Sequence, residues 1–121
     1  WYLGKNPPVF FERNLRSMLA VANEHDVKIL LATFASSGRF SNHYASTDVY
    51  KTGFDEQNDM VKQVAESHEV LLLDFDALMP QEKLYWNDGV HLNEKGALLK
   101  AKTFAEFIHE KEVIPENHRD N

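Results

Sequence analysis

The stretch VKILLATF, from Val27 to Phe34, decides the fold class of this chain. It is apolar and rich in branched side chains, and only Lys28 and Thr33 interrupt it. Successive side chains of a strand point to opposite faces, so a nearly continuous apolar run indicates a strand buried on both faces, as in a parallel sheet. The stretch VLLLDF, from Val70 to Phe75, has the same character. Together the two stretches predict an α/β protein.

Three segments with helical periodicity lie before, between and after these strands. The first follows Pro7 and Pro8, which suit the entrance of a helix because proline lacks an N–H that the first turn does not need. The second extends from Phe54 to Glu69 with Asp55 as its expected N-cap, and the third begins after Asn93, which is another good N-cap. The apolar positions expected to face the core are Phe11, Leu15, Met18, Leu19 and Ala22 in the first segment, Met60, Val61, Val64 and Ala65 in the second, and Ala97, Leu98, Ala101, Phe104, Ala105 and Ile108 in the third.

The order helix, strand, helix, strand, helix indicates parallel strands joined by right-handed crossovers. Two such strands do not make a sheet that stands alone, because their hydrogen-bonding edges need neighbours. The chain also starts with WYLGKNPP, an apolar beginning at Trp1 that needs a cover. We therefore expect residues 1–121 to be the C-terminal portion of a single doubly wound domain. The N-terminal half of that domain, or self-association, would cover the open surfaces.

Composition narrows the classes of partner. The formal charge is 13 − 19 = −6, and no cluster of Lys and Arg indicates a nucleic-acid partner. The absence of cysteine excludes disulfides, thiol catalysis and cysteine-based zinc sites, but it does not assign a compartment. No apolar run is long enough to cross a bilayer, so we expect no transmembrane segment.

The segment from Ala35 to Gly53 has neither helical nor strand periodicity and is rich in Ser, Asn, Thr and Gly. A loop of this length in a small domain is usually functional or disordered. It follows the carboxyl end of a strand, where ligands bind in open α/β sheets. Its aromatic residues Phe40, Tyr44 and Tyr50 could form a lid over a substrate, and disorder is the competing interpretation.

A second informative stretch is YWNDGVHLNEKG, from Tyr85 to Gly96, which leads from a loop into the last helix. Residues three apart can lie on the same side of a tight turn, so the carboxylate of Asp88 could reach Nδ1 of His91. That contact would fix the tautomer of the imidazole and leave Nε2 as a general base. The expected distance is roughly 2.6–3.2 Å. The alternative is ordinary turn chemistry, because Asn, Asp and Gly all favour turns.

Aromatic–Asn–Asp–Gly–Val–His–Leu–Asn–x–x–Gly before a C-terminal helix resembles the last sequence block of the SGNH, or GDSL, hydrolases. In that family the block supplies the Asp and His of a Ser-His-Asp triad, so the resemblance implies these roles for Asp88 and His91. It continues upstream over a helix that contains Asn58 and a strand that ends in Asp74, and it covers Pro8 to Ile108. It implies a three-layer α/β/α, flavodoxin-like domain with a parallel sheet.

The chain departs from this family where the nucleophile should lie. SGNH hydrolases carry their serine in a Gly-Asp-Ser block near the start of the domain, followed by a Gly block and a Gly-x-Asn-Asp block that help to form the oxyanion hole. The serines of FASSGRF follow a late strand, and EQNDM lies within a predicted helix and lacks the glycine. The resemblance therefore places the nucleophile outside this chain and implies that the chain alone is inactive. A nucleophile inside it would be sought first at Ser36, Ser37 and Ser41.

Two hypotheses for function follow. In the first, the parent protein is an esterase, lipase or other acylhydrolase that forms an acyl-enzyme from a small-molecule ester, such as an acylated sugar or a lipid, without a cofactor or a metal. Trp86, Tyr44 and Phe40 are then candidates for contact with substrate, and plain packing under the turn is the alternative for Trp86. In the second, the chain is a non-catalytic α/β binding or interaction module in which Asp88 and His91 only shape a turn.

Overall fold

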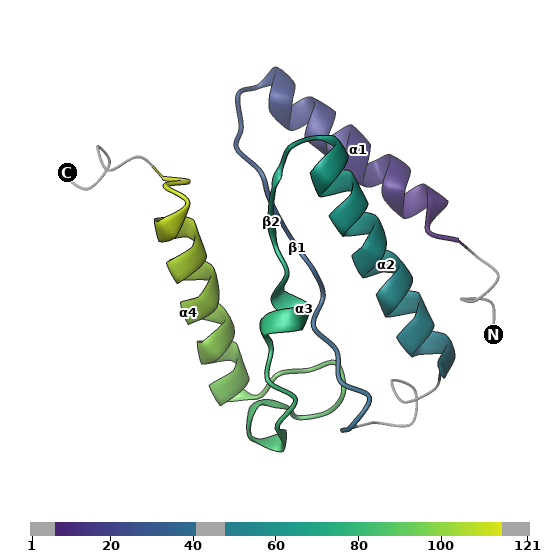
Figure 1. Cartoon of the computed structure of the whole chain (residues 1–121), viewed down its shortest axis with the longest axis vertical. Coiled ribbons are helices and arrows are strands. Elements are labelled where there is room, and N and C mark those ends of the chain that lie inside the picture. Colours follow the sequence, from purple (N-terminus) through teal and green to yellow (C-terminus); the bar gives the residue numbers. More distant parts are fainter. Residues whose placement is uncertain (1–6, 41–47, 115–121) are drawn as a thin grey trace.

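The computed structural model describes residues 7–40 and 48–114, which form a small sheet between helices (Figure 1). The order of elements confirms the predicted alternation of helices and strands. In chain order, the elements are α1 (Val9–Glu24), β1 (Leu30–Ala32), α2 (Asp48–Ser67), β2 (Leu71–Leu73), the short α3 (Phe75–Leu78), the 3-10 helix η2 (Lys83–Tyr85) and α4 (Glu94–Glu110).

The two strands are parallel, with Leu30 opposite Leu71 and Ala32 opposite Leu73. This pairing confirms the prediction from the two apolar stretches. Both strands are shorter than those stretches, because a ladder extends only where residues have a partner opposite them. The N–H of Thr33 still donates to the carbonyl oxygen of Leu73, at 3.1 Å, just beyond the end of β1.

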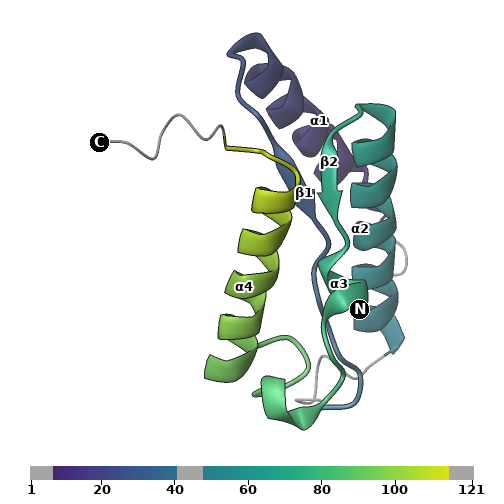
Figure 2. The same cartoon turned by 60° about the vertical axis from the view of Figure 1, so that its left-hand side comes forward.

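Alternate side chains of the strands enter two separate cores. Leu31 packs against a core around Leu15 and Val64, which α1 and α2 contribute. Leu73 belongs to the second core, against which Phe104 of α4 packs. Figures 1 and 2 show the same division, with α1 and α2 on one side of the strands and α4 on the other. The chain therefore has the predicted α/β/α layers around a parallel sheet.

The second helix begins earlier than predicted. α2 starts at Asp48, so residues 48–53 are helical rather than part of a loop, and Asp55 lies inside the helix instead of capping it. Gly53 within a helix costs about 1 kcal/mol relative to alanine. Packing offsets this cost, because the rings of Phe54 and Phe34 lie 5.1 Å apart between centroids. Contacts distant in sequence thus extend a helix that local periodicity ends.

The faces of the outer helices also differ in part from the prediction. Leu15 and Leu19 of α1 are buried as predicted, but Met18 is 57% exposed. Leu98 of α4 is 71% exposed, and its neighbour Leu99 packs on the core instead. Four other positions that were predicted to face the core are exposed as well. These are Phe11, Ala97, Ala101 and Ala105.

A close approach between α4 and η2 sets the rotation of α4. A Cβ added to Gly96 would collide with the carbonyl oxygen of Tyr85, so only glycine lets the first turn of α4 lie this close to η2. Asn93 caps the same turn as predicted, because its Oδ1 accepts a hydrogen bond from the N–H of Gly96 at 3.0 Å. These two contacts turn Leu99 toward the sheet and Leu98 toward solvent.

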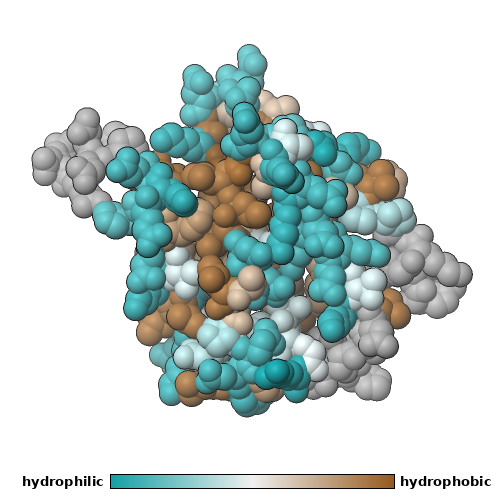
Figure 3. All heavy atoms as spheres, in the orientation of Figure 1, coloured by the Kyte–Doolittle hydropathy of each residue, from teal (hydrophilic) through white to brown (hydrophobic). Residues whose placement is uncertain are grey.

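Apolar side chains gather between α4 and α2 on the face that Figure 3 shows. Among the residues that the structure describes, no helix is both long and apolar enough to span a bilayer.

Candidate active site

The turn between η2 and α4 is anchored by Trp86. This side chain is 2% exposed, and its Nε1 donates to the carbonyl oxygen of Pro80 at 2.8 Å. Trp86 pairs with Leu92 in an antiparallel bridge, and the N–H of Asn93 donates to the carbonyl oxygen of Tyr85 at 3.1 Å. The residues between these anchors form a short hairpin-like turn that a buried aromatic side chain holds in place.

Asp88 and His91 face each other across this turn. Nδ1 of His91 lies 2.9 Å from Oδ2 of Asp88 and 3.1 Å from Oδ1, within the expected range. Oδ1 also accepts hydrogen bonds from the N–H groups of Val90 and His91, each at 2.8 Å. The predicted contact is therefore present, and the carboxylate also organises the backbone of the turn.

The same contacts keep Asp88 ionised. The backbone N–H of Val90, followed by the side chain of His91, lowers the pKa of Asp88 to about 2. An ionised carboxylate accepts hydrogen bonds only, so it holds the proton of a neutral His91 on Nδ1 and leaves Nε2 as the proton acceptor. The side chain of His91 is 71% exposed, so a reacting group can approach it from solvent.

The turn lies at the carboxyl end of the parallel strands. The N–H of Ser37, which follows β1, donates to the carbonyl oxygen of Gly89 at 2.8 Å and joins the two loops. The first part of the predicted loop, residues 35–40, therefore lies at the same end of the sheet as His91. Tyr44 and Ser41 lie outside the described residues, so the lid proposal stays a prediction.

The other candidates for contact with substrate belong to the core side of the turn. Trp86 forms a buried cluster with Leu73 and Phe75, and its 2% exposure favours the packing alternative. Phe40 is half-buried, packs against the same cluster and lies under Lys83, whose Nζ is 5.5 Å from the ring centroid. Among the serines considered as a nucleophile within the chain, Ser37 is buried, with 2% of its surface exposed.

A polar network behind the turn was not predicted. Thr33 Oγ1 donates to Oδ1 of Asp74 at 2.8 Å, and Nζ of Lys62 lies 2.8 Å from Oδ2. Burial opposes the ionisation of Asp74, but the hydrogen bonds from Lys62 and Thr33 outweigh it and lower the pKa of Asp74. A threonine inside an apolar strand and an aspartate at the end of the next one were the signals in the sequence. This network ties the carboxyl ends of the two strands together.

Asn58 of α2 makes a second link to the same end of the sheet. It is 6% exposed, its Oδ1 accepts from the N–H of Phe34 at 2.8 Å, and its Nδ2 donates to the carbonyl oxygen of Phe34 at 2.9 Å. The side chain thus replaces a missing strand neighbour at that residue. Across residues 7–40 and 48–114, no group of three or more His, Asp or Glu side chains could hold a metal ion.

Comparison with known proteins gives the fold a class. A scan against models of protein families finds no match, and a search of curated proteins finds none either. Among solved structures, the chain is similar to a GDSL-like lipase of Bacteroides thetaiotaomicron VPI-5482, with a TM-score of 0.70 and 15% identity over 88% of this chain and 55% of that one. It is also similar to a protein of Parabacteroides merdae ATCC 43184 named as a candidate GDSL-like lipase, with a TM-score of 0.69 and 21% identity over 84% of this chain and 50% of that one.

These likenesses show an SGNH/GDSL hydrolase-like fold and confirm the predicted fold class. The chain spans about half the length of either of the two structures. The sequence resemblance in the turn and the structural likeness therefore point to the same architecture by separate routes.

Proposed function

We propose that this chain supplies the acid–base pair of a GDSL-type ester hydrolase. The contact between Asp88 and Nδ1 of His91, at 2.9 Å, is the observation that carries the proposal. Three features support it: the pair lies at the carboxyl end of a parallel sheet, where α/β proteins bind ligands; His91 is exposed; and the fold is that of GDSL-like lipases.

In this mechanism Nε2 of His91 accepts the proton of a serine that attacks the ester carbonyl, and later returns a proton to the departing alcohol. Asp88 keeps the tautomer correct and stabilises the imidazolium that forms. The pKa of Asp88, about 2, keeps this partner ionised through the neutral range. The serine and the oxyanion donors come from sequence outside residues 1–121, which form the C-terminal portion of the domain.

The test compares the isolated chain with the product of the complete reading frame that contains it. A short-chain aryl ester serves as substrate. We expect no hydrolysis by the isolated chain, and hydrolysis by the complete product that His91→Ala lowers by about a thousandfold or more. His109→Ala, which removes an exposed histidine at the end of α4, is the control and should leave the rate unchanged.

Two outcomes would contradict the proposal. Full activity of the complete product with His91→Ala would remove His91 from the mechanism. Hydrolysis by the isolated chain that disappears with His91→Ala would show a nucleophile within these residues, and Ser36, Ser37 and Ser41 would be changed first.

One observation favours the alternative function, a non-catalytic α/β binding module. Oδ1 of Asp88 accepts from two backbone N–H groups, so Asp88 shapes the turn whether or not His91 reacts. On this alternative, the complete product has no esterase activity, and His91→Ala changes neither activity nor binding. A complete product that is inactive on several esters would select it.

A further inference from the structure

A polar pocket of about 490 Å³ lies beside the candidate active site, between the loops that follow the two strands and the first turns of α2. It is separate from Asp88 and His91, and nothing in the mechanism uses it. Among the described residues that line it, no side chain is aliphatic or aromatic. The polar side chains that line it are Ser36, Arg39, Lys51, Asp55, Asp76 and Gln81.

The charges of this pocket balance. Arg39 and Lys51 contribute two cations, and Asp55 and Asp76 contribute two carboxylates. An anion would meet the carboxylates and a cation would meet the two basic groups, so neither has a net electrostatic advantage. An acyl chain would meet mainly polar groups, so its burial there would contribute little. A neutral group with many hydroxyls fits best, because each hydroxyl can donate to a carboxylate and accept from a cation.

The pocket offers hydrogen-bonding capacity that the protein leaves in part unused. Within the described residues, the N–H of Ser36 is the one donor to the carboxylate of Asp76, at 3.1 Å. Nη1 of Arg39 donates to the carbonyl oxygen of Gln81 at 3.4 Å, and a guanidinium has five N–H donors. Gln81 Nε2 donates to the carbonyl oxygen of Ser36 at 3.2 Å and holds the two loops together. Hydrogen bonds therefore hold the two loops of the pocket together, and the charged side chains of Arg39 and Asp76 line it.

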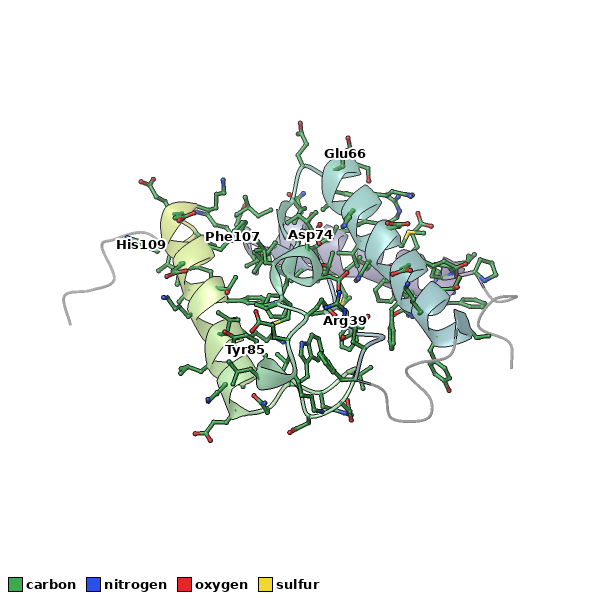
Figure 4. The ribbon with its side chains drawn as sticks, turned by 60° about the horizontal axis from the view of Figure 1, so that its bottom comes forward. Arg39, Glu66, Asp74, Tyr85, Phe107 and His109 are labelled. Carbon is green, nitrogen blue, oxygen red and sulfur yellow. The ribbon has the colours of Figure 1, made fainter. Side chains whose placement is uncertain are left out.

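The pocket adjoins the candidate active site through its wall. Ser36 lines the pocket, and the next residue, Ser37, donates to the carbonyl oxygen of Gly89 in the turn that carries Asp88 and His91. In Figure 4, Arg39 and Asp74 lie in the middle of the molecule between α2 and α4, and Tyr85 lies toward α4. The backbone that forms one wall of the pocket is thus bonded to the turn that carries His91.

We propose that this pocket binds a neutral, hydroxyl-rich unit of the ester, so that the substrate class is an acylated carbohydrate. This inference rests on the proposed function and selects the sugar over the lipid. Arg39 and Lys51 donate to hydroxyl oxygens of the sugar, and Asp76 accepts from its hydroxyl groups.

Binding is tested first on the ¹⁵N-labelled chain with methyl α-D-glucopyranoside as the probe. We expect saturable shifts of the amide signals of Ser36, Arg39 and Gln81. Arg39→Met keeps the length of the side chain and removes its donors. It should weaken binding about tenfold, which corresponds to about 1.4 kcal/mol, because the hydrogen bonds from a charged group are lost. Arg13→Met, an exposed arginine of α1 away from the pocket, is the matched control and should bind the glycoside unchanged.

Two other probes decide the ligand class. Inorganic phosphate represents an anion and n-hexanol an apolar chain, and both should leave the three amide signals unchanged at the same concentrations. The absence of saturable shifts with the glycoside, or stronger shifts with phosphate or hexanol, would overturn the proposal.

The second measurement uses the complete reading-frame product, so that poor behaviour of the isolated chain cannot hide the answer. Arg39→Met should raise KM about tenfold for an acetylated methyl glucoside, leave kcat unchanged, and leave both constants unchanged for an aryl acetate. Equal effects on the two esters would overturn the proposal. His91→Ala should abolish hydrolysis and keep glycoside binding, so a failure of the pocket and a failure of the esterase mechanism give different results.

Discussion

Two regions of the molecule differ in how well their side chains are paired or covered. They are the carboxyl end of the sheet and the flank that α1 and Val27 form. At the carboxyl end, Asn58, Asp74 and Trp86 each pair their side-chain polar atoms with partners from other elements. On the flank, Met18 and Val21 of α1 are 57% and 61% exposed and line one side of an open apolar hollow with Val27. The polar side chains at the carboxyl end are therefore paired within the described residues, whereas the apolar side chains of the flank are exposed.

This difference agrees with the comparison to solved structures. The structural alignment includes 88% of this chain but only 55% of the Bacteroides GDSL-like lipase, so the remainder of that protein has no counterpart here. We propose that the N-terminal half of the domain covers the flank, and that self-association covers it when that half is absent. Four substitutions break or sharpen the contrast between end and flank.

The largest effect is expected at Trp86. Trp86→Ala removes a side chain that is 2% exposed and leaves a cavity beneath the turn, which should lower the free energy of unfolding by about 3–5 kcal/mol. Urea denaturation measures the loss. Leu84→Ala, two residues earlier and 48% exposed, is the control and should change stability little. Similar losses for both variants would show that the turn has no anchor of its own.

Asn58 should have the next largest effect. Asn58→Ala leaves the N–H and carbonyl groups of Phe34 without the partners that the buried side chain of Asn58 supplies, and each group that stays unpaired costs about 1–3 kcal/mol. We expect a loss of about 2–4 kcal/mol in the free energy of unfolding. The neighbouring Gln57→Ala is exposed and should be nearly neutral. A loss below about 1 kcal/mol would mean that water replaces Asn58 at this position.

The flank is tested with a charge instead of a truncation. Met18→Glu should change the free energy of unfolding by no more than about 0.5 kcal/mol, because the side chain is already exposed. It should, however, reduce self-association of the isolated chain, which sedimentation velocity measures over a range of concentrations. Asn23→Glu adds the same charge to the same helix at a polar position and should not. If both variants associate like the unaltered chain, the α1 hollow is not the surface that the chain covers.

How well a feature of the fold can be predicted from the sequence depends on how far apart in the sequence its contacting residues lie. The apolar runs that mark the strands, the Asn93 cap and the contact between Asp88 and His91 can each be recognised from residues within a few positions of one another, so periodicity and turn geometry predict them. The start of α2 and the rotation of α4 depend on Phe34 and Tyr85, which lie far along the chain. No local pattern reports such contacts.

The same reasoning applies to the site. Asp88 and His91 could be paired from sequence because they belong to one turn, and the family resemblance gave that pair a chemical role. The pocket beside them combines residues from two loops and a helix, and it could not be assembled before the topology was known. The pairing of Asn58 with Phe34 spans 24 positions and was hidden for the same reason.

The smallest effect is expected at Asp76, which lies at the border between the paired end and open solvent. Burial, followed by the nearby carboxylates of Asp74 and Asp55, raises the pKa of Asp76 above its ordinary value of 3.8. The folded state therefore holds this proton more tightly than the unfolded state does. The stabilisation that results is complete below pH 3.8 and is lost as the pH rises through the folded-state pKa.

Asp76→Asn keeps an oxygen that can accept from the N–H of Ser36 but carries no charge at any pH. We therefore expect the variant to be slightly more stable than the unaltered chain at pH 7, and the advantage to disappear below pH 3.8. Urea midpoints at the two pH values measure the difference, with the exposed Asp59→Asn as the control for a general change in net charge. A variant that is less stable at pH 7 would show that the ionised carboxylate of Asp76 stabilises the fold. Asp76 would then be grouped with the paired polar side chains at the carboxyl end of the sheet.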